Sequence, residues 1–270
     1  MRGFYIFGVV KTMKFLFCLV LAVSVMQARA ADSSFKFDSA AAFETIKQDY
    51  GEFYKSERLW RAAKMYSIGA VMANTNIDTE FHSWHQDNIH SDTSDDFARV
   101  AKLFGEKIIL VPVATAAASM QFFEPQSKLG QWGEKTMRSY LVAGPAMFAV
   151  QLMTGGSRPK DKYQNAHWRP FNDDNGVSGH SFVGAVPFLA FAKMEGLSNT
   201  QRNLAYLAST FSAWSRINDD AHYLSQAMLG WYMAWESVDA VHNSGKTGQW
   251  YSLQPYAFGD GVGLSVSVTW

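Results

Sequence analysis

The sequence predicts an all-α fold, a bundle of buried helices, and three observations carry that prediction. Hydrophobic residues make up 48% of the 270 residues, enough to bury a sizeable core. Apolar residues recur at three-to-four spacing over residues 40–54 and 58–73, as on the surface helices of globular proteins. Longer apolar segments interrupted by Gly, Pro, Ser or Gln then cover residues 108–123, 140–154, 180–194, 204–215 and 221–242. Their lengths and interruptions are typical of bundle helices rather than membrane spans, although peripheral contact with a membrane stays open.

The two ends of the chain depart from this pattern. A short basic region, an apolar run over 15–26 and an Ala-x-Ala cleavage signal predict that residues 1–30 are a signal peptide. The protein is therefore expected to be exported, to the periplasm. At the other end, period-two alternation on both sides of a Gly-Asp-Gly turn predicts a short β-hairpin within a tail over 245–270. The helical domain is expected over 31–244.

Charge and cysteine content exclude several classes of protein. Cys18, the single cysteine, lies inside the predicted signal peptide, so the mature chain has no disulfide and no thiol chemistry. Without residues 1–30 the chain carries 20 basic and 24 acidic residues and no basic block. A mildly acidic protein of this kind is a poor candidate for binding nucleic acid.

Two polar segments between the apolar ones carry residues suited to binding an anion. In KYQNAHWRP, Lys162 and Arg169 are seven residues apart and a proline follows the arginine. In GVSGHS, Ser178 is a good helix N-cap, Gly179 lets a ligand approach the backbone, and His180 lies in the first helical turn. A helix N-terminus presents free N–H groups and the positive end of its dipole, which suits phosphate.

The third polar segment is SRINDDAHYLSQ, residues 215–226. Its Asn-Asp-Asp run predicts that one helix ends there and that the next begins near Ala221. His222 would then lie in a first turn, where the helix dipole lowers its pKa. Gln226 lies four residues later on the same face and can hydrogen-bond one ring nitrogen. Each segment alone also has an ordinary explanation: solvated charges, a helix cap, or a buried histidine paired with an amide.

Taken together, Lys-x6-Arg-Pro, Ser-Gly-His and Ser-Arg-x5-His resemble, in order and spacing, the three-part signature of the type 2 phosphatidic acid phosphatase (PAP2) superfamily. That superfamily includes bacterial non-specific acid phosphatases, lipid phosphatases and vanadium haloperoxidases. The resemblance covers residues 162–226, about a quarter of the chain. It departs from the family pattern at Val177, where proline is usual, and at Gln226, where the family has a carboxylate.

The resemblance implies a helical core of the PAP2/haloperoxidase type and a metal-independent phosphatase without a cofactor. Its substrate would be a small phosphomonoester, or a lipid phosphate or diphosphate. It implies that His222 attacks phosphorus to form a phosphohistidine and that His180 protonates the leaving oxygen. The residues implied to cradle the phosphoryl oxygens are Lys162, Arg169, Ser178, Gly179 and Arg216. Because Gln226 can accept a hydrogen bond from His222 but offers no full charge, Gln226→Asp is expected to keep or raise turnover.

Two other functions stay open at this point. The same cradle binds vanadate, so a vanadate-dependent haloperoxidase is one alternative. A non-catalytic protein that binds phosphate or phospholipid is the other. Neither the substrate nor the oligomeric state can be inferred from the sequence.

Several polar residues outside the three motifs need an interpretation. His82, His85 and His90 lie among Asp78, Asp87 and Asp92; two of these histidines are three residues apart and could share a helix face as metal ligands. The simpler interpretation is a solvated loop or a lip over the active site. A second Arg-Pro pair begins at Arg158, but position 151 is glutamine, so the pair is set aside as failing the signature. The glycines at 155, 156 and 184 are interpreted as turn and helix-packing residues.

Overall fold

The computed structural model describes residues 39–124, 127–161, 165–247, 251–258 and 261–268. The chain divides into two units, Met1–Ala40 and Ala41–Trp270. The predicted signal peptide, residues 1–30, lies outside the described residues, and the fold below is that of the second unit.

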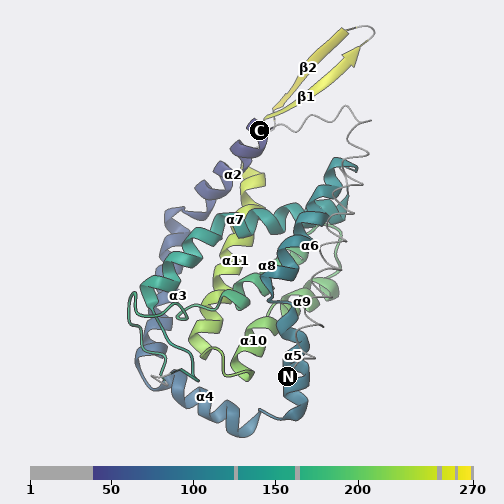
Figure 1. The fold of residues 1–270 in the computed structure, drawn as a ribbon. Coiled ribbons are helices and arrows are strands. Elements are labelled where there is room, and N and C mark those ends of the chain that lie inside the picture. The colour runs from purple at the N-terminus through teal and green to yellow at the C-terminus, as the bar shows by residue number, and fades with distance from the viewer. Residues whose placement is uncertain (1–38, 125–126, 162–164, 248–250, 259–260, 269–270) are drawn as a thin grey trace, which may run out of the picture. The chain divides into compact units, whose positions relative to one another are not determined.

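This unit is predominantly helical, as the sequence predicts (Figure 1). Its helices are α2 (Ser39–Phe53), α3 (Ser56–Asn74), α4 (Ile77–Asn88), α5 (Asp92–Leu103), α6 (Lys107–Ser119), the 3-10 helix η1 (Met120–Phe122), α7 (Lys128–Thr154), α8 (Gly179–Ala192), α9 (Asn199–Ala208), α10 (Phe211–Asn218) and α11 (Leu224–Thr247). In the tail, β1 (Tyr251–Phe258) and β2 (Gly261–Val268) pair antiparallel.

The core is built around α8 and α11, which pack against each other and against α7 (Figure 1). Helix α8 is apolar nearly all round because other helices cover it on several sides. The buried side chains shared by these three helices include Val142, Met147, Phe182, Val186, Leu189, Leu229 and Met233. Gly230 permits a close approach of α11 to the start of α8, since a Cβ there would lie 2.3 Å from the carbonyl oxygen of Ser178. This contact brings the start of α8 against the first turns of α11.

Buried ion pairs attach the N-terminal helices to this core. Arg58 on α3 is 5% exposed and its guanidinium contacts Glu52, Glu236 and Asp239. Arg61, half exposed one turn later, contacts the same Glu236 at 2.8 Å. A buried charge is tolerated only when it is paired, so these carboxylates set where α3 lies on α11.

The polar stretch around residues 74–96 is not the solvated loop that its composition suggested. It contains the whole of α4 and the start of α5. Asp78 and His85 on α4 are 0% and 3% exposed, so α4 buries part of its polar side. Composition misleads here because Asp78, His82 and Gln86 of α4 find partners on other elements rather than in water.

Two further boundaries differ from expectation. The apolar segment 204–215 is divided between α9 and α10, with Ser209 and Thr210 between them. Helix α10 ends at Asn218, as predicted, but α11 begins at Leu224. His222 therefore lies two residues before a helix rather than in its first turn. Within the described residues, no helix combines the length and the apolar character needed to cross a membrane.

Candidate active site

Gln226 is hydrogen-bonded at both ends of its side-chain amide and is fully buried. Its Oε1 accepts from Nδ1 of His222 at 2.9 Å and from the backbone N–H of Tyr223 at 3.1 Å. Its Nε2 donates to the carbonyl oxygen of Ser157 at 2.8 Å. A backbone N–H can only donate and a backbone carbonyl can only accept, so these two partners determine the orientation of the amide. The proton on His222 must then sit on Nδ1, which leaves Nε2 with a free lone pair.

The bond to Tyr223 explains why glutamine suits position 226. Helix α11 begins at Leu224, so Tyr223 is its N-cap and Gln226 is the third helical residue. A Gln or Glu at that position commonly reaches back to the N-cap N–H, half of the capping-box arrangement. Gln226 therefore caps the helix and sets the tautomer of His222 with one oxygen atom.

His222 is 4% exposed, and its pKa is lowered to about 3. Burial is the largest cause; the bond to Gln226 opposes it, and the charges of Arg216 and Arg158 and the nearby His180 add to the lowering. Burial, rather than the helix dipole that the sequence suggested, is thus the main cause. The imidazole is neutral at physiological pH, in the form that can act as a nucleophile.

Two guanidinium groups act on this imidazole. Arg216 on α10 is 6% exposed, donates to Asp219 Oδ2 at 3.0 Å, and has an Nε without a hydrogen-bond partner among the described atoms. Burial and the charge of Arg158 both lower the pKa of Arg216. Arg158 is held by its own Nε, which donates to Asn175 Oδ1 at 2.7 Å. Because the charge of Arg158 is close enough to lower the pKa of Arg216, an anion bound between the two guanidinium groups would be stabilised.

The start of α8 lies beside these arginines. Ser178 is the N-cap of α8, as predicted, and its Oγ accepts from the N–H of Ser181 at 3.3 Å. The N–H of Ser178 donates to the backbone oxygen of Gln226 at 2.9 Å, which ties the two motifs together. At Gly179, a Cβ would meet only Gln151 Nε2, at 3.5 Å, so the backbone there is accessible to a ligand.

His180 follows in the first turn of α8 and has a carboxylate partner that its sequence neighbours do not reveal. Its Nε2 lies 3.4 Å from Glu106 Oε1, at the start of α6. Burial and then the charge of Arg216 lower the pKa of His180, whereas Glu106 raises it. The two histidines thus differ: His180 has a partner that favours its protonated form, and His222 has a neutral one.

Of the predicted pair Lys162 and Arg169, the structure describes only the arginine. Lys162 lies outside the described residues. The guanidinium of Arg169 donates to Asn165 Oδ1 at 2.8 Å and to the carbonyl oxygen of His167 at 3.4 Å. Their roles as phosphate ligands stay predictions.

Arg158, which sequence reasoning set aside, is the arginine whose charge reaches both His222 and Arg216. It has the signature's spacing, since Gln151 lies seven residues before it and Pro159 directly after. Gln151, near the end of α7, donates from Nε2 to the carbonyl oxygen of Val177 at 2.9 Å, beside Ser178. The spacing could therefore have identified Arg158 from the sequence. It was overlooked because position 151 is glutamine, where the signature has lysine.

The loop between α7 and α8 brings these groups together through close backbone contacts. Gly155, with φ of 56°, ends α7 in the left-handed conformation. A Cβ at Gly156 would lie 2.9 Å from Gly176 Cα and 3.2 Å from Gln226 Nε2. These glycines are turn residues, as predicted, and Gly156 lets the amide of Gln226 reach Ser157.

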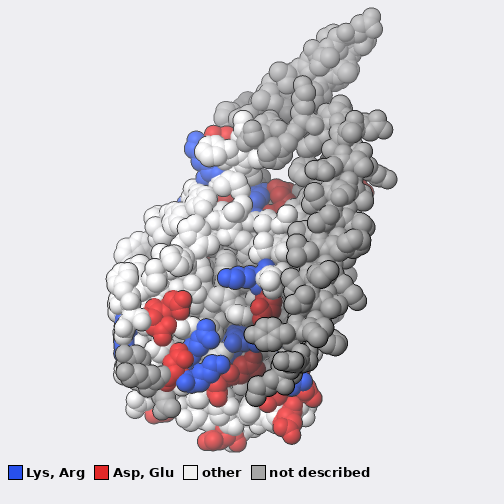
Figure 2. All heavy atoms as spheres, in the orientation of Figure 1, with Lys and Arg blue, Asp and Glu red and all other residues white. Residues whose placement is uncertain are grey.

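Charged side chains of both signs gather near this region of the surface. Figure 2 shows them close together over α10, α4 and the first turns of α11, whereas most other described atoms on that face are uncharged. No three His, Cys, Asp or Glu side chains within the described residues are grouped so that they could hold a metal ion.

Comparisons of the chain with protein-family models, with curated proteins and with solved structures return no match.

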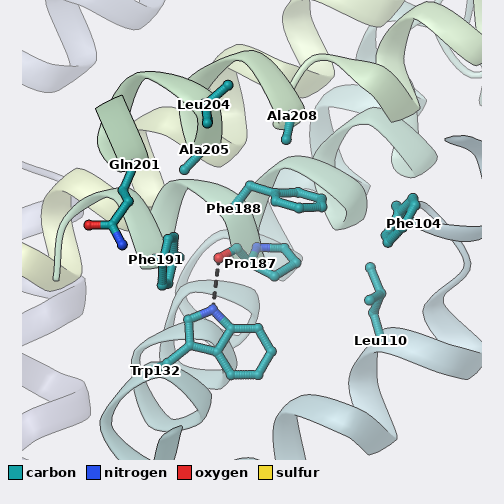
Figure 3. Close-up of a pocket in the computed structure, with 10 residues that line it drawn as sticks. All are labelled: Phe104, Leu110, Trp132, Pro187, Phe188, Phe191, Gln201, Leu204, Ala205 and Ala208. Atoms are coloured by element: carbon teal, nitrogen blue, oxygen red, sulfur yellow. Dashed lines mark hydrogen bonds between the residues drawn. The ribbon is translucent and has the colours of Figure 1, made fainter. Parts of the chain in front are cut away.

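An apolar cavity lies on the same side of α8 as His180. Its volume is about 540 Å³, within the range of small-molecule pockets. Figure 3 shows its lining: Phe104, Leu110, Trp132, Pro187, Phe188, Phe191, Gln201, Leu204, Ala205 and Ala208. Two polar side-chain atoms among these residues are bonded to the protein, since Trp132 Nε1 donates to the Pro187 carbonyl and Gln201 Oε1 accepts from the N–H of Ser198. The cavity wall therefore consists almost entirely of carbon.

Proposed function

We propose that the chain is a metal-independent phosphatase that acts through a phosphohistidine at His222, on the pattern of the PAP2 superfamily. One observation carries the proposal: a buried, neutral histidine whose Nδ1 is committed to Gln226, beside two guanidinium groups and a second histidine. The remaining Nε2 lone pair is a nucleophile, and the arginines supply the charge that a phosphoryl group needs.

In the first step, Nε2 of His222 attacks phosphorus and the bond between phosphorus and the ester oxygen breaks. The leaving oxygen takes a proton from His180, and the phosphoryl group is now bonded to nitrogen. In the second step, His180 removes a proton from water as the water oxygen attacks phosphorus. The nitrogen–phosphorus bond breaks, inorganic phosphate is released, and both histidines return to their starting states.

The surroundings of the two histidines suit these roles. Gln226 Oε1 accepts the hydrogen bond from Nδ1 of His222. Its partial negative charge stabilises the positive charge that develops on the imidazole ring. A phosphate dianion bound by Arg216 and Arg158 would raise the pKa of His180, which burial and Arg216 lower in the free protein. Substrate binding would therefore prepare the acid, and the N–H groups at the start of α8 would stabilise the equatorial oxygens.

The apolar cavity favours a substrate with a hydrocarbon chain, a lipid phosphate or diphosphate. Pro187 and Phe191 follow His180 by seven and eleven residues, so all three lie along one side of α8. At 1.5 Å per residue, Pro187 and Phe191 are roughly 10 and 16 Å from His180 along the axis. Phe104, which borders the cavity, is two residues from Glu106, the partner of His180.

The test is hydrolysis of p-nitrophenyl phosphate in EDTA by the purified protein. We expect turnover, competitive inhibition by vanadate, and loss of activity in His222→Asn, which keeps a donor for Gln226. Vanadate binding without any turnover would instead support the non-catalytic phosphate binder, and peroxide-dependent halide oxidation would support the haloperoxidase.

Dodecyl phosphate tests the chain-bearing substrate class separately. Its KM should be at least about tenfold below that of p-nitrophenyl phosphate, because burying each additional methylene contributes about 0.8 kcal/mol. Ala208→Trp, which fills the cavity, should remove that advantage. Leu207→Trp, on the exposed side of α9, should keep it.

A further inference from the structure

Helix α4 contacts the turn that carries His222, although none of its residues belongs to the three motifs. The carboxylate of Asp78 accepts from the backbone N–H of Ser225 at 2.9 Å and from the Ser225 hydroxyl. Asp78 is fully buried and 147 residues away in sequence. Because Ser225 is the second residue of α11, Asp78 caps that helix from another element. The N–H groups at the start of α11 are therefore capped both by a residue of the helix itself, Gln226, and by a residue of another helix, Asp78.

One turn further along α4, His82 contacts Asp220, the residue at which the chain turns before His222. His82 Nε2 lies 2.7 Å from Asp220 Oδ1, and the His82 ring meets that of Tyr223 edge-on at 5.6 Å. Asp220 has φ of 53°, in the left-handed region that residues other than glycine seldom adopt. Such a conformation is strained and persists only where the surroundings enforce it. The hydrogen bond between His82 and Asp220 helps to enforce it.

A third contact continues the same surface. Gln86, the next residue along this side of α4, donates from Nε2 to the carbonyl oxygen of Ile217 at 3.3 Å. Positions 78, 82 and 86 are four apart and so form one stripe of the helix. The stripe contacts the turn at Ile217, Asp220 and Ser225, on both sides of His222.

We propose that Asp78 and His82 are positioning residues, which act through the turn 217–225 to hold His222 at the angle where Nδ1 meets Gln226 and Nε2 faces the phosphate. This inference rests on the proposed function, and it assigns a role to the polar cluster of α4 that the signature does not include. Asp78 and His82, together called the brace, orient the nucleophile without touching the substrate. Loss of the brace therefore lowers kcat and leaves KM little changed.

The experiment measures kcat and KM for p-nitrophenyl phosphate in the full chain carrying Asp78→Ala, Asp78→Asn or His82→Ala. We expect the alanine variants to lose roughly tenfold in kcat, as small misplacements of a reacting group do, with KM within about twofold. Asp78→Asn should recover most of the rate, because its amide still accepts from the Ser225 N–H. Asp87→Ala, an exposed acidic residue on the same helix, is the matched control and should behave as the wild type.

A double-mutant cycle separates positioning from general destabilisation. Glycine adopts positive φ without strain, so Asp220→Gly should make His82 dispensable. His82→Ala should then reduce kcat in the wild-type background but not in the Asp220→Gly background. Folded alanine variants with wild-type kcat, or an equal loss in Asp87→Ala, would overturn the proposal. This cycle also decides the matter if Asp78→Ala fails to fold.

A nitrogen-15 NMR measurement of the His222 ring distinguishes failure of the brace from failure of the proposed function. If the wild type hydrolyses nothing, the phosphatase proposal falls, but the Nδ1–H tautomer of His222 can still be observed. Its loss in Asp78→Ala and His82→Ala would support the brace even then. An unchanged tautomer in both variants of such an inactive protein would refute it.

Discussion

Replacing Gln226 by glutamate changes one donor group and leaves the shape of the side chain intact. Both bonds to Oε1, from His222 and from the Tyr223 N–H, are retained and become charge-assisted. The donor to the Ser157 carbonyl is lost, and an oxygen faces that carbonyl where Nε2 lay at 2.8 Å. The same substitution is thus expected to help catalysis and to weaken the fold.

Both effects can be sized from these contacts. Leaving a buried acceptor without its donor costs about 1–3 kcal/mol, which for a domain of this size lowers Tm by roughly 2–4 °C per kcal/mol. A hydrogen bond to a charged acceptor is about twice as strong as to a neutral one, and a gain of about 1 kcal/mol in the transition state is roughly fivefold in kcat. The carboxylate also raises the pKa of His222, so activity, which needs the neutral imidazole, is lost at a higher pH on the acid side.

The assay compares Tm and the pH profile of kcat for wild type, Gln226→Glu and Gln226→Asp. Aspartate is one methylene shorter and cannot bridge His222, Tyr223 and Ser157 together, so it should be less stable and slower than both. This reverses the expectation drawn from sequence, which was formed without knowledge of the bonds to Tyr223 and Ser157. An aspartate variant that equals the wild type in Tm and turnover would refute the role assigned to these bonds.

Three further predictions follow from single contacts. In steady-state kinetics, Arg158→Ala should raise KM for p-nitrophenyl phosphate at least about tenfold, whereas Arg169→Ala should raise it by less than about threefold. The opposite order would identify Arg169 as the phosphate ligand. When the pH falls from 7 to 5, the free energy of unfolding measured in urea should decrease by about 2 kcal/mol more for the wild type than for His222→Asn. The reason is that His222 stays neutral in the folded protein but takes up a proton in the unfolded chain. Equal pH dependence in the two proteins would contradict the low pKa. Arg58→Ala should lower the free energy of unfolding by about 3 kcal/mol and Arg61→Ala by at most about 1 kcal/mol in the same experiment, since Arg58 is buried and contacts three carboxylates whereas Arg61 is half exposed and contacts one; equal losses would argue against the buried network.

The helices could be predicted because apolar periodicity is a local property of the chain. Helices α2 and α3 coincide closely with the expected segments, and α7 ends at Thr154 as expected. Helix α4 was missed for the same reason: its buried side is polar, and Asp78 and His82 are satisfied by partners some 140 residues away. A local pattern carries no information about such partners.

The sequence by itself determined the all-α class, the cap at Ser178, the end of α10 at Asn218 and the pairing of His222 with Gln226, because each depends on neighbours within a few residues. Only the tertiary structure showed that Arg158 acts on His222 beside the predicted Arg216, and that Glu106 is the carboxylate that contacts His180. It also showed why a glutamine fits position 226. Those outcomes depend on burial and on the approach of α4, the 155–158 loop and α6 to α11 and α8. Electrostatic effects act through space, so they follow distance in the fold rather than spacing along the chain.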